Sequence, residues 1–159
     1  MKIGVVSDTH SMELPAQMMN DFKTVDIIIH AGDFCTVADY EKLAKIKQVQ
    51  AVYGNMDESA IRKLWPRKQI LKYGNCTVGV FHGEGAPDHL LDTVTNEFKN
   101  DHVQLIIFGH SHQPLHQTID HVIYFNPGSP NDTVFAPYRS YGIIEITANK
   151  INPKIIKVK

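Results

Sequence analysis

Side chains that can bind metal ions occur in this sequence in short clusters separated by long intervals. The clusters are Asp8-Thr9-His10, Gly32-Asp33, Gly54-Asn55, His82-Gly83 and Gly109-His110-Ser111-His112. Each cluster follows a short apolar stretch, which predicts that each lies at the end of a β-strand. Because the carboxyl ends of parallel strands meet at one edge of a sheet, we expect the clusters to converge on a single site.

The first two clusters combine carboxylates with an imidazole, a donor set that suits a borderline metal such as Zn, Mn or Fe better than Ca. Asp8 and His10 are two residues apart, so in an extended segment both would point to one side and bind the same ion, with Thr9 turned away. Gly32 allows the backbone to turn sharply and approach a bound ion. The two oxygens of Asp33 are enough to bridge two cations.

The later clusters add one neutral oxygen donor, Asn55, and three imidazoles. Two of these, His110 and His112, could each serve a different ion of a close pair. Each cluster alone has an ordinary structural explanation, since an Asp at a strand end is more often a turn former or helix N-cap, and a lone His is more often hydrogen-bonded or exposed. Turn formation does not require ligand residues at five strand ends, so the clusters together predict a metal site.

The intervals between the clusters predict the elements that must position them. Apolar runs at 3–6, 25–29 and 49–53 alternate with helical patterns at 14–22 and 37–47, an order that implies right-handed crossovers and a parallel sheet. A short helix at 58–64 precedes strands 69–73 and 76–81, which flank the turn Gly74-Asn75. A helix over 88–98 and a strand over 103–108 follow. We expect strands 115–118, 122–125, 141–146 and 154–158 to give the second half a sheet of its own. The sequence therefore predicts an α/β fold, most simply a four-layer α/β/β/α sandwich of two mixed β-sheets flanked by helices.

Composition predicts one domain, residues 1–159, whose core needs no disulfide. Lys+Arg 16 against Asp+Glu 17 gives a net charge of -1, which disfavours non-specific binding to nucleic acids or membranes.

The cysteines and the apolar stretches bear on the location of the protein. Cys35 and Cys76 form no Cys-x-x-Cys motif. No apolar stretch approaches the ~20 residues that span a bilayer, and the N-terminus enters a strand pattern without a signal peptide. We expect a cytoplasmic protein with reduced cysteines. A homodimer is possible, although no motif specifies one.

The five clusters, in this order and with these intervals, resemble those of the calcineurin-like metallophosphoesterases. Asn126-Pro127-Gly128-Ser129 adds a resemblance to the small YfcE-like phosphodiesterases. The resemblance implies the metallophosphoesterase fold and two divalent ions, most simply Mn, with Zn, Fe or Ni as alternatives. It implies that one ion is held by Asp8, His10, Asp33 and His112. It implies that the other is held by Asp33, Asn55, His82 and His110.

In that interpretation Asp33 bridges the ions, and Asp33, Asn55 and His110 are the catalytic residues. A water or hydroxide between the ions attacks the phosphorus of a small-molecule phosphate ester in line with the leaving oxygen. One departure from the family pattern matters, because many relatives have a proton-donating His where this chain has Met56, whose thioether donates no proton. A preference for leaving groups of low pKa follows, with Asp57 as a candidate substitute donor.

Two other functions compete with a phosphodiesterase. One is a phosphomonoesterase acting on nucleotides or phosphoproteins, which the absence of a His at Met56 disfavours. The other is a non-catalytic binding scaffold like the retromer subunit Vps29, which should lack at least one ligand, whereas this chain lacks none. No G-x-G-x-x-G or P-loop follows the first strand, which excludes a dinucleotide or ATP cradle there.

The remaining polar residues are expected to play supporting or surface roles. His30 is expected in the core behind the site, Cys35 as inert packing at its rim, and Asn126 and Ser129 in a turn beside it. Arg62 and Arg139 could each contact a substrate phosphate but are expected to be solvated. The remaining histidines are expected at the surface: His89, His102, His116 and His121.

Overall fold

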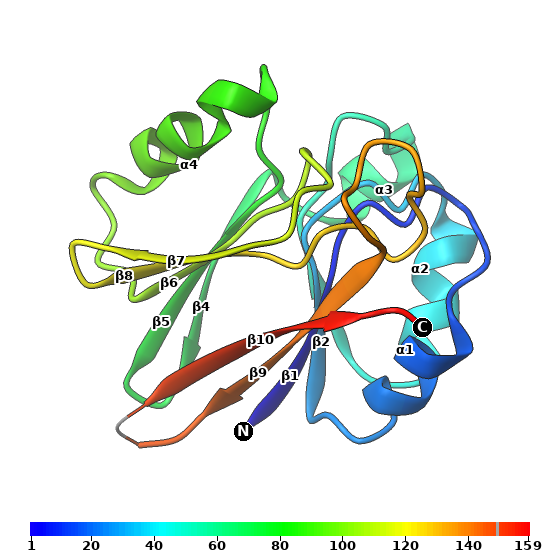
Figure 1. Ribbon diagram of the computed structural model, residues 1–159, viewed down its shortest axis with the longest axis horizontal. Coiled ribbons are helices and arrows are strands. Elements are labelled where there is room, and N and C mark those ends of the chain that lie inside the picture. The colour runs from blue at the N-terminus through cyan, green and yellow to red at the C-terminus, as the bar shows by residue number, and fades with distance from the viewer. Residues whose placement is uncertain (149) are drawn as a thin grey trace.

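The computed structural model describes residues 1–148 and 150–159. Within these residues the chain forms two five-stranded sheets, with strand orders β10-β9-β1-β2-β3 and β4-β5-β6-β8-β7. The sheets face each other, with α1, α2 and α3 outside the first sheet and α4 outside the second (Figure 1). The predicted four-layer α/β/β/α sandwich of two mixed sheets is therefore confirmed.

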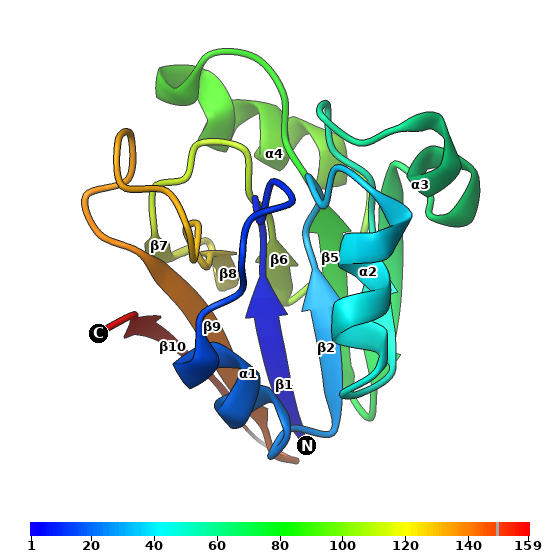
Figure 2. The same cartoon turned by 90° about the vertical axis from the view of Figure 1, so that its right-hand side faces the viewer.

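The first half of the chain builds the centre of the first sheet and its helices. Its strands β1 (Lys2–Val6), β2 (Ile27–His30) and β3 (Val49–Ala51) run parallel, as the alternating pattern predicts. The helices that follow them are α1 (Ala16–Phe22), α2 (Val37–Ala44) and α3 (Ser59–Leu64). The arrows of β1 and β2 point to the same end of the molecule, where the connecting loops gather (Figure 2).

The second sheet delivers further loops to that end. It contains the antiparallel hairpin of β4 (Lys68–Tyr73) and β5 (Cys76–Phe81), predicted from Gly74-Asn75. The 3-10 turn η1 (Pro87–His89) and α4 (Leu90–Phe98) lead to β6 (Leu105–Ile107), which is parallel to β5. At the other edge, β7 (Leu115–Ile119) pairs antiparallel with β8 (Val122–Asn126).

The expectation that all later strands share one sheet is wrong for the last two. Strand β9 (Ser140–Ile146) pairs antiparallel with β1, placing Ile144 opposite Ile3, and β10 (Ile151–Lys157) pairs with β9. Both therefore extend the first sheet. The apolar pattern of β9 predicts a buried strand, but it does not identify the neighbour that supplies its hydrogen bonds, because that pairing is non-local.

Three apolar clusters hold the four layers together. The central cluster lies between the sheets and includes Ile3, Val5 and Ile29 from the first sheet against Val80 and Ile107 from the second. A second cluster packs the helices of the first half on their sheet, and a third packs α4 on the other. Because Met18, Phe22, Leu43, Val94 and Phe98 fill these outer layers, the central strands β1, β2, β5 and β6 are buried on both faces.

No helix within residues 1–148 and 150–159 has the length and apolar character needed to cross a bilayer.

Candidate metal centre

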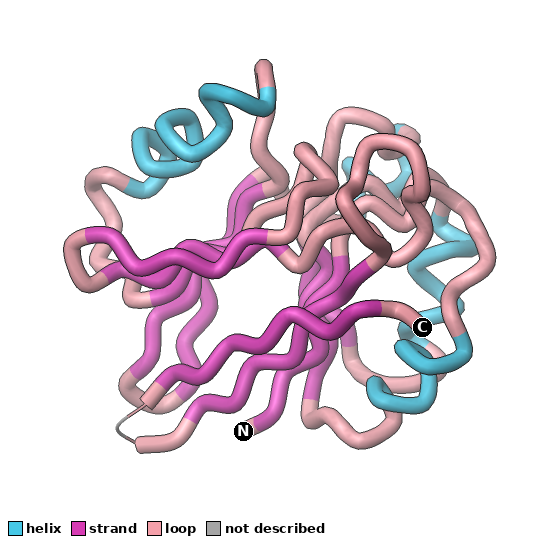
Figure 3. Tube along the Cα trace, viewed as in Figure 1, coloured by secondary structure: helices cyan, strands magenta, loops and turns pink. Residues whose placement is uncertain are grey.

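Loops that leave the carboxyl ends of strands in both sheets gather at one end of the sandwich (Figure 3). At their centre lies Asp8, whose side chain is completely buried. Its Oδ2 accepts hydrogen bonds from the Ser7 hydroxyl and from the backbone N–H of His110. Its Oδ1 has no hydrogen-bond partner in the described part of the chain. A buried carboxylate oxygen without a partner is costly, and a cation at this point would satisfy it.

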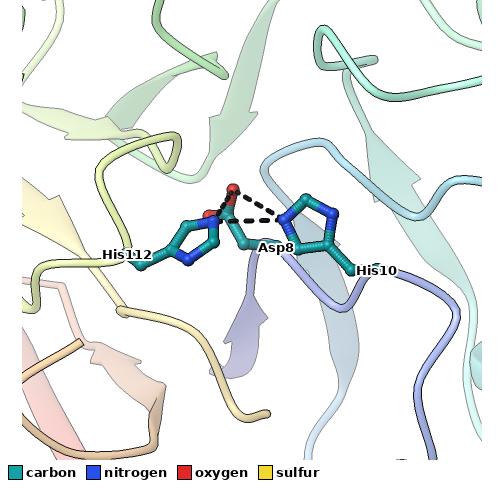
Figure 4. A group of neighbouring side chains, drawn as sticks. All are labelled: Asp8, His10 and His112. Atoms are coloured by element: carbon teal, nitrogen blue, oxygen red, sulfur yellow. Dashed lines mark hydrogen bonds and ion pairs between the residues drawn. The ribbon is translucent and has the colours of Figure 1, made fainter. Parts of the chain in front are cut away.

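Asp8, His10 and His112 form one group of potential ligands (Figure 4). The Nε2 atoms of the two histidines are 3.1 Å apart, and those of His112 and His10 lie 3.3 Å and 3.9 Å from Asp8 Oδ1. His112 Nδ1 lies 2.6 Å from Asp132 Oδ2, so Nδ1 is the nitrogen that donates to the carboxylate. That bond leaves Nε2 free to face an ion.

Asp8, Asp33 and His82 form a second group. His82 Nε2 lies 3.4 Å from Asp33 Oδ2 and 4.0 Å from Asp8 Oδ1, while its Nδ1 lies 2.7 Å from the carbonyl oxygen of Ala31. Asp33 Oδ2 is also 3.9 Å from His10 Nε2. Asp33 therefore belongs to the second group and also approaches His10 of the first, whereas Asp8 is common to both groups.

Asn55 and His110 complete the cluster beside the second group. Asn55 Oδ1 lies 3.1 Å from His82 Nε2 and 3.0 Å from His110 Nδ1, and His110 Nε2 lies 2.9 Å from the carbonyl oxygen of Gly85. All seven residues singled out from the sequence therefore lie together at one edge of the sandwich.

The backbone that brings them together is not extended, contrary to the expectation for Asp8 and His10. Both residues are left-handed, with φ of 56° and 49°, and Asp33, His110 and His112 have φ of 61°, 69° and 57°. Asp and His tolerate this region better than most residues, but each such position costs roughly 1–3 kcal/mol. Asp8 and His10 converge because of this turn, and Thr9 points away toward His30.

Two glycines allow the loops to approach each other. A Cβ on Gly54 would collide with Asp33 Oδ1, and one on Gly32 would lie 2.6 Å from His82 Nδ1. Gly32 also has a φ of 97°, which side chains disfavour. The prediction that Gly32 permits a sharp turn near the site is confirmed.

Electrostatic coupling shifts the pKa values of these groups in opposite directions. Burial alone would raise the pKa of Asp8, but the nearby imidazoles of His112, whose Nε2 lies 3.3 Å from Oδ1, and of His82 hold it below its ordinary value. Burial would lower the pKa of His82 and of His112. Hydrogen bonds to Asp33 and Asp8, respectively, together with the carboxylate charges around them, raise both to about 9. Protons on these imidazoles balance the carboxylates, and a divalent cation could replace that positive charge.

His30 supports the site from behind, as predicted. It is fully buried, its Nε2 lies 3.1 Å from the Thr9 hydroxyl, and its Nδ1 accepts the backbone N–H of Gly32 at 3.1 Å. Burial lowers the pKa of His30 to about 3, so the ring is neutral and acts through these hydrogen bonds.

The late Asn126–Ser129 turn lies beside the site as predicted. Asn126 Nδ2 donates to the carbonyl oxygen of Gly109 at 2.8 Å, and the Ser129 hydroxyl donates to that of Asp8 at 2.8 Å. These bonds tie the loops after β1 and β6 to the turn after β8.

The position of Asp57 disfavours its candidate role as a proton donor. Its side chain is buried, and its oxygens accept backbone N–H groups from Asp33 at 3.0 Å, Cys35 at 2.8 Å and Gly54 at 2.7 Å. Burial raises its pKa, an effect that these three bonds oppose. Asp57 therefore fixes the loops that carry the ligands. Met56 is 59% exposed and reaches the site only through its N–H, which donates to Asp33 Oδ1 at 2.8 Å.

Asp132 is a residue of the site that the sequence pattern does not predict. Besides contacting His112, its carboxylate accepts backbone N–H groups from Val134, Phe135 and Ala136, so it orders the loop before β9 and orients a potential ligand. An Asp in a polar loop has no local pattern that distinguishes this role from that of an ordinary turn residue.

The other residues set aside from the sequence mostly behave as expected. The four histidines at positions 89, 102, 116 and 121 are exposed. Cys35 is half-buried at the rim, its Sγ is 3.7 Å from His10 Nδ1, and burial raises the pKa of its thiol. Arg62 is exposed, as expected, and its guanidinium is also hydrogen-bonded to the loop after β3. Arg139 is half-buried beside a pocket that Met12 also lines.

A four-layer sandwich that carries a carboxylate and imidazole cluster at the carboxyl ends of its strands has the architecture of a metal-dependent phosphoesterase. The family model described as the calcineurin-like phosphoesterase superfamily domain matches residues 1–149. The chain belongs to this family, and the prediction of a phosphoester hydrolase is confirmed. Membership also implies divalent metal ions, for which the unpartnered Asp8 Oδ1 and the surrounding nitrogen and oxygen donors are suited.

Relatives agree with this assignment, and a solved structure shares the fold. A probable metallophosphoesterase of Methanocaldococcus jannaschii is 33% identical over 100% of this chain and 82% of its own length. A phosphodiesterase of the same archaeon is 27% identical over 80% of this chain and 83% of its own length. The crystal structure of Chaetomium thermophilum Vps29 superimposes with a TM-score of 0.80 at 18% identity, covering 99% of this chain and 96% of Vps29, a similarity of fold.

Proposed function

We propose that this protein is a phosphodiesterase that hydrolyses a small phosphate diester at a site for two divalent ions, most simply Mn²⁺. The observation that carries the proposal is the unpartnered Oδ1 of buried Asp8, which lies where the two groups of potential ligands meet. When bound, two such ions would polarise the phosphoryl oxygens and activate a water for in-line attack on phosphorus.

The residues of the cluster divide by position. His10 and His112 lie near Asp8 in one group, and His82 lies near it in the other, with Asp33 as the proposed bridge. Asn55 is exposed at the mouth of the site, so we assign it, together with Asp33 and His110, to contact with the reacting phosphoryl group.

No side chain next to Asn55 replaces the missing acid. The Met56 thioether is exposed and Asp57 is committed to three backbone N–H groups. The leaving oxygen must therefore depart unprotonated or be stabilised by an ion. In a series of aryl phosphate diesters, the rate should fall steeply as the pKa of the leaving phenol rises, and a flat dependence would contradict this part of the proposal.

Hydrolysis of bis-p-nitrophenyl phosphate tests the main proposal. The protein, freed of metal with a chelator and reconstituted in turn with Mn, Zn, Fe and Ni, should gain activity with at least one ion and lose it again on chelation. Asp33→Ala should abolish turnover while leaving the fold intact by circular dichroism. Asp92→Ala, at an exposed position of α4, is the control. Inactivity with every ion would overturn the proposal, and activity in Asp33→Ala would remove the bridging role.

The monoesterase alternative is separated by assaying p-nitrophenyl phosphate under the same conditions. Similarity to a phosphodiesterase of Methanocaldococcus jannaschii, together with the lack of a proton donor, supports the diester. A faster reaction with the monoester would reverse this preference.

A further inference from the structure

A pocket opens beside the candidate metal centre, between the loop after β3, the start of β4 and the loop after β5. Its volume is about 210 Å³. Since a water molecule takes up roughly 30 Å³ in the liquid, a phosphate-sized group fits. Asn55 and His82 line both this pocket and the metal centre. A group bound in the pocket would therefore be continuous with one bound at the ions.

Arg62 supplies a fixed cation to the pocket. Its Nε donates to the carbonyl oxygen of Asp57 and its Nη2 to that of Asn55, both at 2.8 Å, and the guanidinium lies 4.9 Å from the centre of the Tyr53 ring. These bonds use two of its five N–H donors, and both acceptors are neutral. Within residues 1–148 and 150–159, no carboxylate lies within 4.0 Å of this guanidinium, so its charge is not balanced by an ion pair.

The other arginine of the pocket differs in this respect. Arg67 donates to Glu84 at 3.0 Å and to Glu97 at 2.9 Å, and its guanidinium lies 4.5 Å from the centre of the Phe81 ring. Two carboxylates balance the single charge of Arg67. One of them, Glu84, is the acidic side chain that lines the pocket, so this carboxylate is already paired. Arg62 is therefore the group in this pocket that is best prepared to receive an anion.

We propose that Arg62 binds a second anionic group of the substrate, so that the preferred substrate is a small phosphate diester with a further phosphate close to the scissile one. This inference rests on the proposed phosphodiesterase function. The planar guanidinium fork matches the oxygens of a phosphate, and its position is set before binding. Asn55 joins the two sites, since its carbonyl oxygen holds Arg62 while its Oδ1 lies 3.1 Å from His82 Nε2.

A matched pair of chromogenic diesters tests the inference. Thymidine 5′-(p-nitrophenyl phosphate) carries only the scissile diester, whereas its 3′-phosphorylated form adds a second phosphate and keeps the same leaving group. The wild-type protein should favour the 3′-phosphorylated form on the order of tenfold in kcat/KM, mainly through KM, because a hydrogen-bonded charge contact forms in the ground state. Hydrolysis of both forms at equal rates would overturn the inference and leave the proposed function standing.

Variants of Arg62 separate anion binding from support of the loop. Arg62→Gln should remove the preference, and Arg62→Lys, which keeps the charge but not the fork, should retain part of it. Lys63→Gln, the same charge change at an exposed neighbour outside the pocket, should leave the preference unchanged. A purely structural role predicts instead that both Arg62 variants slow the two substrates equally.

Binding gives a readout that does not depend on turnover. By calorimetry on Mn-loaded protein, thymidine 3′,5′-bisphosphate should bind on the order of tenfold more tightly than thymidine 5′-monophosphate, and Arg62→Gln should abolish the difference. Equal affinities in the wild-type protein would overturn the inference even if neither diester is hydrolysed, while absence of hydrolysis alone would count against the proposed function.

Discussion

Asp8, a proposed metal ligand, has two features that are unfavourable for folding stability. Its Oδ1 is buried without a hydrogen-bond partner, and its left-handed backbone is unfavourable for a residue with a side chain. Its Oδ2 is held by Ser7 and by the N–H of His110. The free oxygen therefore points to a defined place, which is what a metal ligand needs before the ion arrives.

Asp132 orients His112, a second proposed ligand, and its replacement is our prediction for a single residue. Asp132→Asn replaces the carboxylate that accepts from His112 Nδ1 at 2.6 Å, so the ring is held less firmly and its Nε2 becomes less basic. We expect the affinity for Mn²⁺ to fall about 10- to 100-fold, measured by metal titration. Asp92→Asn, at an exposed position of α4, is the control. Unchanged affinity in Asp132→Asn would show that His112 needs no such partner.

At the scale of the elements, parallel strands deliver the ligands and the loops determine how the ligands meet. The carboxyl ends of β1, β2, β3, β5 and β6 could be predicted from the apolar runs that precede Asp8, Asp33, Asn55, His82 and His110. The backbone conformation of the loops could not, since φ near 50° at Asp8 and His10 depends on packing against other loops. For the same reason, the sequence did not predict the contact of Asp132 with His112 or the pairing of β9 with β1, since both join residues far apart in the chain.

Asp57 is the point at which the loops after β2 and β3 are joined, which gives a prediction for these elements. Asp57→Ala leaves three N–H groups, those of Asp33, Cys35 and Gly54, without their acceptor. We expect the free energy of unfolding to drop by about 2–4 kcal/mol in urea denaturation. Glu58→Ala is the control, because its carboxylate accepts an exposed N–H from Val37, and it should cost no more than about 0.5 kcal/mol. Similar losses in both variants would contradict the role given to Asp57.

For the whole molecule, the site links metal binding, protonation and folding. Two of its imidazoles, His82 and His112, have pKa values raised to about 9, above the 6.5 of an ordinary histidine. A pKa that is higher in the folded than in the unfolded state adds stability that is complete below pH 6.5 and is lost as the pH rises through about 9. A divalent ion bound by these two histidines would have to displace their protons, so we expect its binding to strengthen over the same pH range.

The metal-free protein should therefore melt at progressively lower temperature between pH 6.5 and pH 9, while saturating Mn²⁺ should raise the melting temperature by an amount that grows with pH. Thermal unfolding followed by circular dichroism at pH 6, 7.5 and 9, with chelator or with Mn²⁺, measures both trends. Replacing the exposed His89 and His102 with Gln should leave them unchanged. If Mn²⁺ raised the melting temperature by the same amount at all three pH values, His82 and His112 would not be the groups that lose protons when the ion binds.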